Sequence, residues 1–231
     1  MKLLKIITLL VIFIGNSSLF AQANIKSVNL KKGQILDILM LTTKPETEKA
    51  FEKYRKTAFP VAFKRSYKPL PGFRIVETTQ GNIQPTSFIF GQWSDLNNRE
   101  QFISEIETVV PDFHEQRRTI WSIFNLVYYE MPEDLSFSMD KNKYNVVTAY
   151  WKKDNSSFDA FTKQWFKKST ATGGKTVLKL TNGKSPAGYY YNPDLLVVTE
   201  WESKKEFETF MKDKGIYKNE SVLHVNQFVI N

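Results

Sequence analysis

Apolar and polar residues alternate along the chain in a pattern that predicts short strands separated by amphipathic helices. In the first half, strand-like segments lie at 35–41, 73–77, 88–93 and 124–129, and helices are expected at about 43–60 and 97–109. The first helix begins with a threonine cap and Pro45, and it carries an apolar stripe that includes Tyr54 and Ala58. Pro60 is expected to kink or end it.

The second half repeats this order of elements. Its strand-like segments lie at 144–151, 176–180, 195–201 and 222–229, with helices expected from about 155 to 172 and from 204 to 212. An apolar run that closes on Trp93 recurs 108 positions later as a run that closes on Trp201. Each tryptophan is followed nine residues on by a phenylalanine, Phe102 or Phe210. The pattern indicates two like halves in one chain.

Each half has the order strand, helix, strand, strand, helix, strand, which is typical of a ferredoxin-like α+β arrangement. One face of each four-stranded sheet is covered by its own helices, and the sister sheet can cover the other face. We therefore expect an α+β fold in which two tandem ferredoxin-like repeats, 24–131 and 144–231, form one pseudo-twofold barrel. A polar connector at 132–143 joins them. A monomer with an internal pseudo-dimer is expected, because one chain supplies both sheets.

The first 23 residues have the pattern of a signal peptide. Lys2 and Lys5 precede an apolar core at 6–14 that is too short to span a bilayer, and cleavage is expected after Ala21 or Ala23. The sequence predicts an exported protein, periplasmic or secreted. It contains no cysteine, so its core must stabilise it without disulfides.

Composition and charge exclude some partners. With 42% hydrophobic and 14% aromatic residues, the chain is typical of globular proteins. The net charge is +8, which includes the two lysines of the signal, but basic residues such as Lys49 and Lys53 alternate with Glu48 and Glu52. This mixing indicates a solvated helix face, so no nucleic-acid partner is expected. No membrane partner is expected after signal cleavage, because no other apolar stretch is long enough to span a bilayer.

Residues 201–211, WESKKEFETFM, resemble the signature of the dimeric α+β barrel superfamily. That superfamily includes the antibiotic-biosynthesis monooxygenases and the haem-degrading monooxygenases, and its members place W-x5-F-x2-[aromatic] after their third strand. The first half has Trp93 and Phe102 in this pattern, but Arg99 stands where the middle aromatic residue belongs. The resemblance implies the barrel fold over nearly the whole mature chain and, as one alternative, an oxygenase activity.

Haem oxidation does not follow from the resemblance. The haem-degrading members have a tryptophan as the second aromatic residue and a histidine ligand ten residues further on. Here those positions hold Phe210 and Glu220 in the second half, and Phe102 and Asp112 in the first. No cofactor is therefore expected. His114 lies two residues beyond Asp112 and is expected in a surface loop.

Candidate site residues lie in the last predicted strand and in the first one. His224, Asn226 and Phe228 alternate with a more apolar set, so we expect them to point into the barrel, where an imidazole could act as a base. A hydrogen-bonded histidine without chemistry is the alternative. Asp37 interrupts an apolar strand, so its carboxylate must lie at an edge, be paired, or lie in a polar cavity. If it faces the barrel it is a possible general base, and the alternative is a position at the solvated edge of the strand. The candidate catalytic residues are His224 and Asp37, and the candidate ligand contacts are Asn226, Phe228, Asn145 and Thr148.

Three functions agree with the sequence. The first is the binding of a small apolar or aromatic molecule between the two sheets. The second is a cofactor-independent, monooxygenase-like reaction on such a molecule. The third is a structural role, with side chains filling the barrel. Only two histidines are present, so no metal site is expected.

Overall fold

The computed structural model describes residues 24–186 and 189–231, so the predicted signal peptide at 1–23 lies outside the described residues. The elements of the first half are β1 (Ile25–Leu30), β2 (Ile35–Thr43), α2 (Glu48–Lys64), β3 (Lys68–Gln80), β4 (Ser87–Trp93), α3 (Leu96–Val109), α4 (Phe113–Ile120) and β5 (Trp121–Glu130). Those of the second are β6 (Leu135–Asp140), β7 (Tyr144–Lys152), α5 (Asn155–Ala171), β8 (Lys175–Thr181), β9 (Leu195–Trp201), α6 (Lys204–Met211), α7 (Lys214–Tyr217) and β10 (Val222–Ile230).

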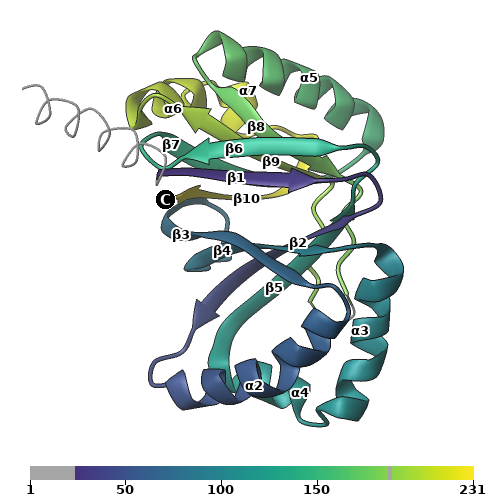
Figure 1. The fold of residues 1–231 in the computed structure, drawn as a ribbon. Helices are drawn as coiled ribbons and strands as arrows, with labels where there is room; N and C mark the ends of the chain where they lie inside the picture. Colours follow the sequence, from purple (N-terminus) through teal and green to yellow (C-terminus); the bar gives the residue numbers. More distant parts are fainter. Residues whose placement is uncertain (1–23, 187–188) are drawn as a thin grey trace, which may run out of the picture.

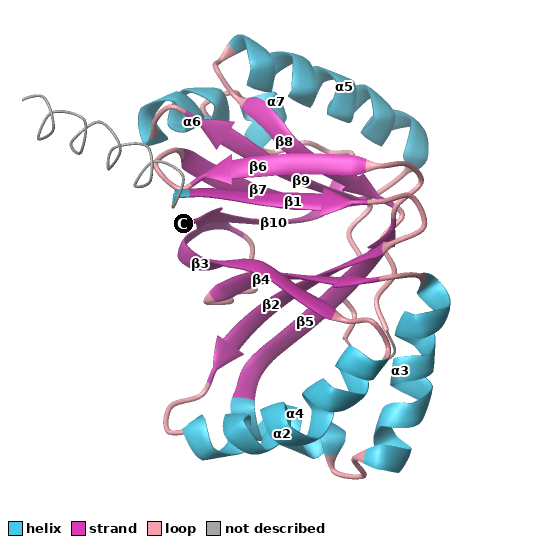
Figure 2. Ribbon diagram, viewed as in Figure 1, coloured by secondary structure: helices cyan, strands magenta, loops and turns pink. Residues whose placement is uncertain are grey.

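Eight strands form one antiparallel sheet in the order β5-β2-β4-β3-β10-β7-β9-β8. Apart from β1 and β6, each half contributes its four strands in the same order, fourth, first, third and second, as a ferredoxin-like sheet does. The halves join where β3 pairs with β10, with Thr78 opposite Phe228. The fold is thus α+β, with two ferredoxin-like repeats that form one barrel within the chain. The strands of the first half, β5-β2-β4-β3, form the first sheet of this barrel, and those of the second half, β10-β7-β9-β8, form the second. The two sheets face each other and the helices lie outside, α2–α4 on one side and α5–α7 on the other (Figures 1 and 2).

Helix α2 continues through Pro60 to Lys64, so of the two effects expected of Pro60, a kink or an end, the end is wrong. The proline removes one backbone donor, and the carbonyl it leaves unpaired is that of Lys56. Both residues are exposed, which leaves this carbonyl accessible to water. The prediction for His114 is also wrong, because it lies on helix α4 and not in a loop.

A separate, two-stranded sheet pairs β1 with β6, with Val28 opposite Phe137. The segment expected to be a polar connector, 132–143, therefore contains a strand. Leu135, Phe137 and Met139 alternate with polar residues in β6. This period-two pattern marks a half-buried strand, but the serines and the flanking charges obscure it.

The space between the two sheets is filled with side chains. The large inward-facing residues of the barrel are buried and pack in one cluster, which includes Leu36, Ile38, Met40, Phe73, Phe88, Phe90, Val147, Leu196, Val198 and Phe228. The apolar faces of β1 and β6 close this cluster through Val28, Leu30, Phe137 and Met139. The place expected to hold a ligand is thus occupied, because phenylalanine side chains from both halves contact one another there.

Each half has one further cluster of buried side chains, which lies between its sheet and its own helices. Along the described residues, no helix has both the length and the apolar character needed to cross a bilayer.

Candidate active site

The structure does not bring the predicted site residues together. Asn226 and Phe228 face the barrel core, where Phe228 packs against Phe88 with ring centroids 5.7 Å apart. The side chain of Asn226 accepts a hydrogen bond from the Tyr191 hydroxyl at 3.1 Å and donates to the carbonyl oxygens of residues 80 and 83. These contacts use the amide of Asn226 for structure. His224 is half-buried, with its ring 5.0 Å from that of Trp151.

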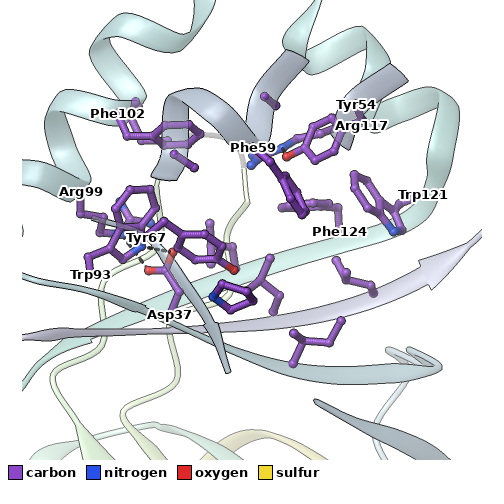
Figure 3. A pocket seen from close by; sticks show the side chains of 18 of the residues that line it. Asp37, Tyr54, Phe59, Tyr67, Trp93, Arg99, Phe102, Arg117, Trp121 and Phe124 are labelled. Carbon is purple, nitrogen blue, oxygen red and sulfur yellow. Dashed lines mark hydrogen bonds and ion pairs between the residues drawn. The ribbon is translucent and has the colours of Figure 1, made fainter. Parts of the chain in front are cut away.

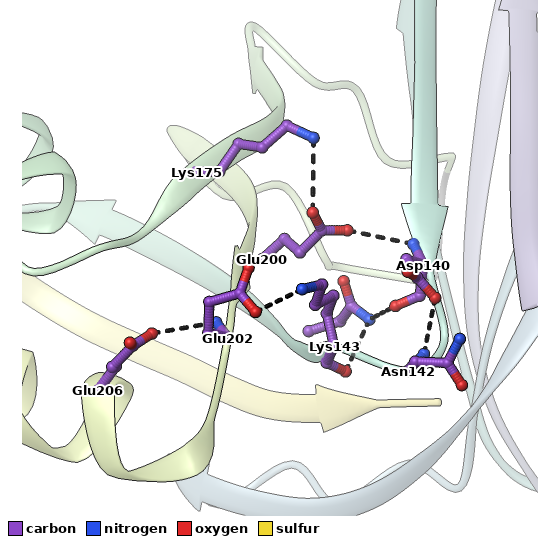
Figure 4. A network of polar contacts seen from close by, with 8 residues as sticks. Asp140, Asn142, Lys143, Lys175, Glu200, Glu202 and Glu206 are labelled. Atoms are coloured by element: carbon purple, nitrogen blue, oxygen red, sulfur yellow. Dashed lines mark hydrogen bonds and ion pairs between the residues drawn. The ribbon is translucent and has the colours of Figure 1, made fainter.

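Asn145 and Thr148 also have structural partners. The amide of Asn145 donates to the carbonyl oxygens of Asp140 and Lys143, at 2.7 and 3.2 Å, and so holds the turn between β6 and β7. This turn belongs to a wider polar network, in which Glu200 links Lys175 to the backbone of Asp140 (Figure 4). The hydroxyl of Thr148 accepts a hydrogen bond from the side-chain amide of Gln227 at 2.9 Å, on the helix side of the second sheet.

A cavity of about 180 Å³ lies between helices α2–α4 and the first sheet (Figure 3). Its wall is mostly aromatic and aliphatic and includes Leu39, Phe51, Tyr54, Ala58, Phe59, Ala62, Tyr67, Ile89, Trp93, Phe102, Trp121 and Phe124. Three charged side chains also line it, those of Asp37, Arg99 and Arg117. Phe51 is 40% exposed, so the cavity borders solvent at this residue.

Asp37 is paired and lines this cavity, which is one of the situations expected for a carboxylate in an apolar strand, but it faces neither the barrel interior nor a solvated edge. Strand β2 lies between β4 and β5, and Asp37 shares its helix-facing side with Ile35 and Leu41. The carboxylate accepts hydrogen bonds from Trp93 Nε1 and Arg99 Nε, each at 2.8 Å. Both members of the Arg99–Asp37 ion pair are buried, and the Arg99 guanidinium lies 3.7 Å from the centroid of the Tyr128 ring.

Arg117 lies at the other end of the cavity, with Tyr54, Trp121 and Phe124 (Figure 3). Its side chain comes from α4 and is 7% exposed. Nε donates to the Tyr54 hydroxyl at 3.0 Å, and Nη1 donates to the Tyr189 hydroxyl. Tyr189 belongs to the loop between β8 and β9, so the second half contributes a contact to this end of the site.

The phenols of the cavity wall are kept neutral by their surroundings. Burial raises the pKa of Tyr54 above its ordinary value, although the neighbouring Arg117 opposes the shift. Burial also raises the pKa of Tyr67, and the charge of Asp37 adds to this effect. At neutral pH both side chains therefore present hydroxyl groups rather than phenolates.

Among the described residues of the second half, the matching space between α5 and its sheet is packed with side chains, and the matching positions explain why. Helices α2 and α5 both have 17 residues, and the eleventh is Ala58 in the first and Trp165 in the second. The Trp165 indole is 1% exposed and donates to the Tyr150 hydroxyl at 2.9 Å. A methyl group in place of an indole leaves the space that forms the cavity.

The charged pair is also specific to the first half. Ile35 is paired with Trp93, and Asp37 follows it by two residues. In the second half Tyr144 is paired with Trp201, and Val146 holds the place of Asp37. Arg99 is matched by Phe207, six residues after the tryptophan in each case. In the second half, the indole N–H of Trp201 donates to the Thr199 hydroxyl at 2.9 Å. The first half has Gly91 at the matching position, opposite Asp37, and there the Trp93 indole donates to Asp37 instead. A Cβ on Gly91 would lie 2.5 Å from the Tyr67 ring, so glycine lets Tyr67 reach the cavity.

Sequence reasoning missed Arg117, Tyr54 and Tyr67 as site residues. Two signals were available. Arg99 interrupts an aromatic signature and Asp37 interrupts an apolar strand, and two opposite charges in predicted core positions can pair. The second signal was the size difference between Ala58 and Trp165, which hold matching positions in the two helices. A small side chain at the place of a large one predicts empty space.

Haem does not fit this cavity. A volume of about 180 Å³ is close to that of an engineered cavity that takes one benzene ring, so a four-pyrrole macrocycle is far too large. The described lining contains neither imidazole nor thiolate, and His114 lies outside it, 2.9 Å from Glu107. Within the described part of the chain, no three His, Cys, Asp or Glu residues gather as a metal ion would require.

No protein-family model and no curated protein matches the sequence. Among solved structures, the chain is similar to an anthrone oxidase-like protein, with a TM-score of 0.50 and 14% identity over 88% of this chain and 94% of that chain. It is also similar to chlorite dismutase from Candidatus Nitrospira defluvii, with a TM-score of 0.49 and 9% identity over 87% and 92% of the two chains. A Fusobacterium nucleatum protein assigned to the monooxygenases gives a TM-score of 0.41 and 12% identity over 87% and 93%. The likeness to the first of these shows the α+β barrel fold over most of the chain.

Proposed function

We propose that the protein binds a small aromatic molecule in the cavity between α2–α4 and the first sheet. The observation that carries this proposal is the difference between the halves. The same position is packed by Trp165 in one half and left open beside Ala58 in the other. An unfilled apolar cavity costs stability, so its presence in the first half, at a position that Trp165 packs in the second, favours a function for it. Its aromatic wall matches a flat ring.

Ligand-dependent thermal unfolding tests this proposal. A compound present at 100 times its Kd adds about 2.7 kcal/mol, which corresponds to a rise in Tm of about 5–10 °C for a chain of this size. We expect such shifts with one- or two-ring compounds such as hydroquinones and naphthoquinones, and none with haemin.

The variant Ala58→Trp should abolish the shifts, because it places in the first half the indole that fills the second. Lys49→Trp adds the same indole at an exposed position of the same helix and should leave them intact. Equal shifts in the Ala58→Trp and Lys49→Trp proteins would locate binding elsewhere and refute the proposal.

A second candidate is oxidation of the bound ring by O2 without a cofactor. Asp37 favours it, because a carboxylate on the wall of a mostly aromatic cavity can accept a proton from an electron-rich phenol. The similarity to an anthrone oxidase-like protein points to the same kind of chemistry. With hydroquinone, two electrons and two protons would pass to O2, giving quinone and hydrogen peroxide.

An oxygen electrode measures this reaction against the rate without protein. We expect the added rate to disappear in Asp37→Asn, assayed below the melting temperature of the variant. An added rate that persists in Asp37→Asn would remove Asp37 from the reaction, and no added rate with any ring compound would leave binding as the function.

We also infer that the protein acts after export, because residues 1–23 have the pattern of a signal peptide. N-terminal sequencing of the mature protein should begin at Gln22 or Asn24. Since one chain supplies both sheets of the barrel, we propose that it is a monomer. A dimer that persists on dilution in size-exclusion chromatography with light scattering would contradict this.

A further inference from the structure

The two buried arginines of the cavity differ in their partners. Arg99 is neutralised by the carboxylate of Asp37 at 2.8 Å. Arg117 has no carboxylate within 4.0 Å among the residues that the structure describes; its side-chain partners there are hydroxyl groups and aromatic rings. A buried cation without a counter-ion is costly, so the two ends of the cavity differ electrostatically.

The surroundings of Arg117 reduce this cost but do not supply the missing charge. The guanidinium carbon lies 4.0 Å from the ring centroid of Phe113 and 4.4 Å from that of Phe124, distances at which ring faces attract cations. Tyr54 does not act as an anion, because burial raises the pKa of its phenol. The net positive charge at this end therefore remains.

The guanidinium also has unused hydrogen-bonding capacity. It carries five N–H donors in a planar fork, of which one on Nε serves Tyr54 and one on Nη1 serves Tyr189. Three donors are left, enough for the two parallel hydrogen bonds that a carboxylate accepts from an arginine. Trp121 and Phe124 line the cavity next to this fork and offer ring surfaces to the rest of a ligand.

We infer that the ligand of this cavity is an aromatic carboxylate, with its ring among Trp121, Phe124 and Phe59 and its carboxylate on Arg117. The inference rests on the proposed function and adds the chemical class of the molecule bound. The carboxylate supplies the counter-ion that Arg117 lacks. The Asp37–Arg99 end is already neutral and does not attract an anion.

The test compares benzoate with benzamide, two ligands of nearly equal shape that differ in charge. Binding to the wild-type protein is followed by quenching of tryptophan fluorescence, since Trp93 and Trp121 both line the cavity, and by calorimetry. Benzoate should bind about 10- to 100-fold more tightly, the range that charge-assisted hydrogen bonds provide. In Arg117→Met, which keeps a long apolar side chain, the two affinities should become equal within about twofold as the charged contact is lost.

The outcomes separate this inference from the function on which it rests. Equal affinities of benzoate and benzamide for the wild-type protein would overturn the anion preference and leave the aromatic cavity as the binding site. Failure of both compounds to bind the wild-type protein would overturn this inference, while the thermal shifts with hydroquinones and naphthoquinones decide the proposed function separately. The wild-type comparison decides even if Arg117→Met does not fold, a point checked by circular dichroism. Ala58→Trp should block both compounds.

Discussion

The Asp37–Arg99 pair allows a quantitative test of how the first half tolerates charge in its core. Both side chains are buried, 6% and 3% exposed, and the carboxylate is also the acceptor for the Trp93 indole. Removing one member of a buried ion pair leaves the other charge without a partner, which costs about 3–5 kcal/mol. Replacing both members with neutral groups of similar volume is often nearly neutral.

The perturbation is a double-mutant cycle with Asp37→Asn and Arg99→Phe. Asparagine keeps an oxygen for the Trp93 N–H, and phenylalanine is the residue that the second half carries at the matching position, Phe207. Each single variant should lose about 3–5 kcal/mol, which lowers Tm by about 6–20 °C at this chain length. The double variant should be more stable than either single variant, with a coupling energy of at least about 2 kcal/mol.

Urea unfolding of the signal-free protein, followed by circular dichroism, measures all four free energies. The reasoning fails if the losses in the two single variants simply add in the double variant. It also fails if Arg99→Phe alone is neutral, because the Asp37 carboxylate would then be tolerated in the core without its cation.

Three further predictions concern packing and capping. Trp165→Ala should open in the second half the space that the first half has, at a cost of about 3–5 kcal/mol in urea unfolding, and a loss below about 1 kcal/mol would show that this core collapses around the gap. Gly91→Ala should displace Tyr67 from the sheet and cost about 1–3 kcal/mol in thermal unfolding, whereas an unchanged Tm would mean that the ring moves freely. Asp95 caps α3, and the backbone N–H of Asn98 lowers its pKa, with the hydroxyl of Ser94 adding to the effect. Because the folded-state pKa is lowered, the stabilisation is present above the ordinary aspartate pKa of about 4 and is lost as pH falls below it. The Tm difference between the wild type and Asp95→Ala should therefore vanish toward pH 2. A Tm difference that is constant with pH would refute this.

The order of elements and the barrel could be predicted from the sequence because both depend on periodic patterns. Trp93 and Trp201 mark matching strand ends, and the helix faces follow from spacings of three and four residues. The strand β6 was missed since it is short and rich in serine, and such a strand is stabilised by its pairing with β1 more than by its own composition.

The candidate site was harder to predict, because it depends on which face of a strand a side chain takes and on what lies opposite. Asp37 was identified as unusual, but its orientation follows from pairing on both sides of β2, which local sequence does not encode. Arg117 lies in a helix that was not predicted, and its contact with Tyr189 joins residues 72 positions apart. The filling of the barrel interior is likewise a property of both halves together.

The pairing of β1 with β6 means that the halves are not independent folding units. Residues 25–30 must find residues 135–140, and Thr78 of β3 must meet Phe228 of β10, so strands far apart in the sequence define both junctions. Contacts of such long range slow folding, because the chain must close large loops before they form. A protein cut between residues 131 and 132 would release two fragments, each with an unpaired strand and an uncovered apolar sheet face. Neither half therefore reaches its final packing until both have been synthesised.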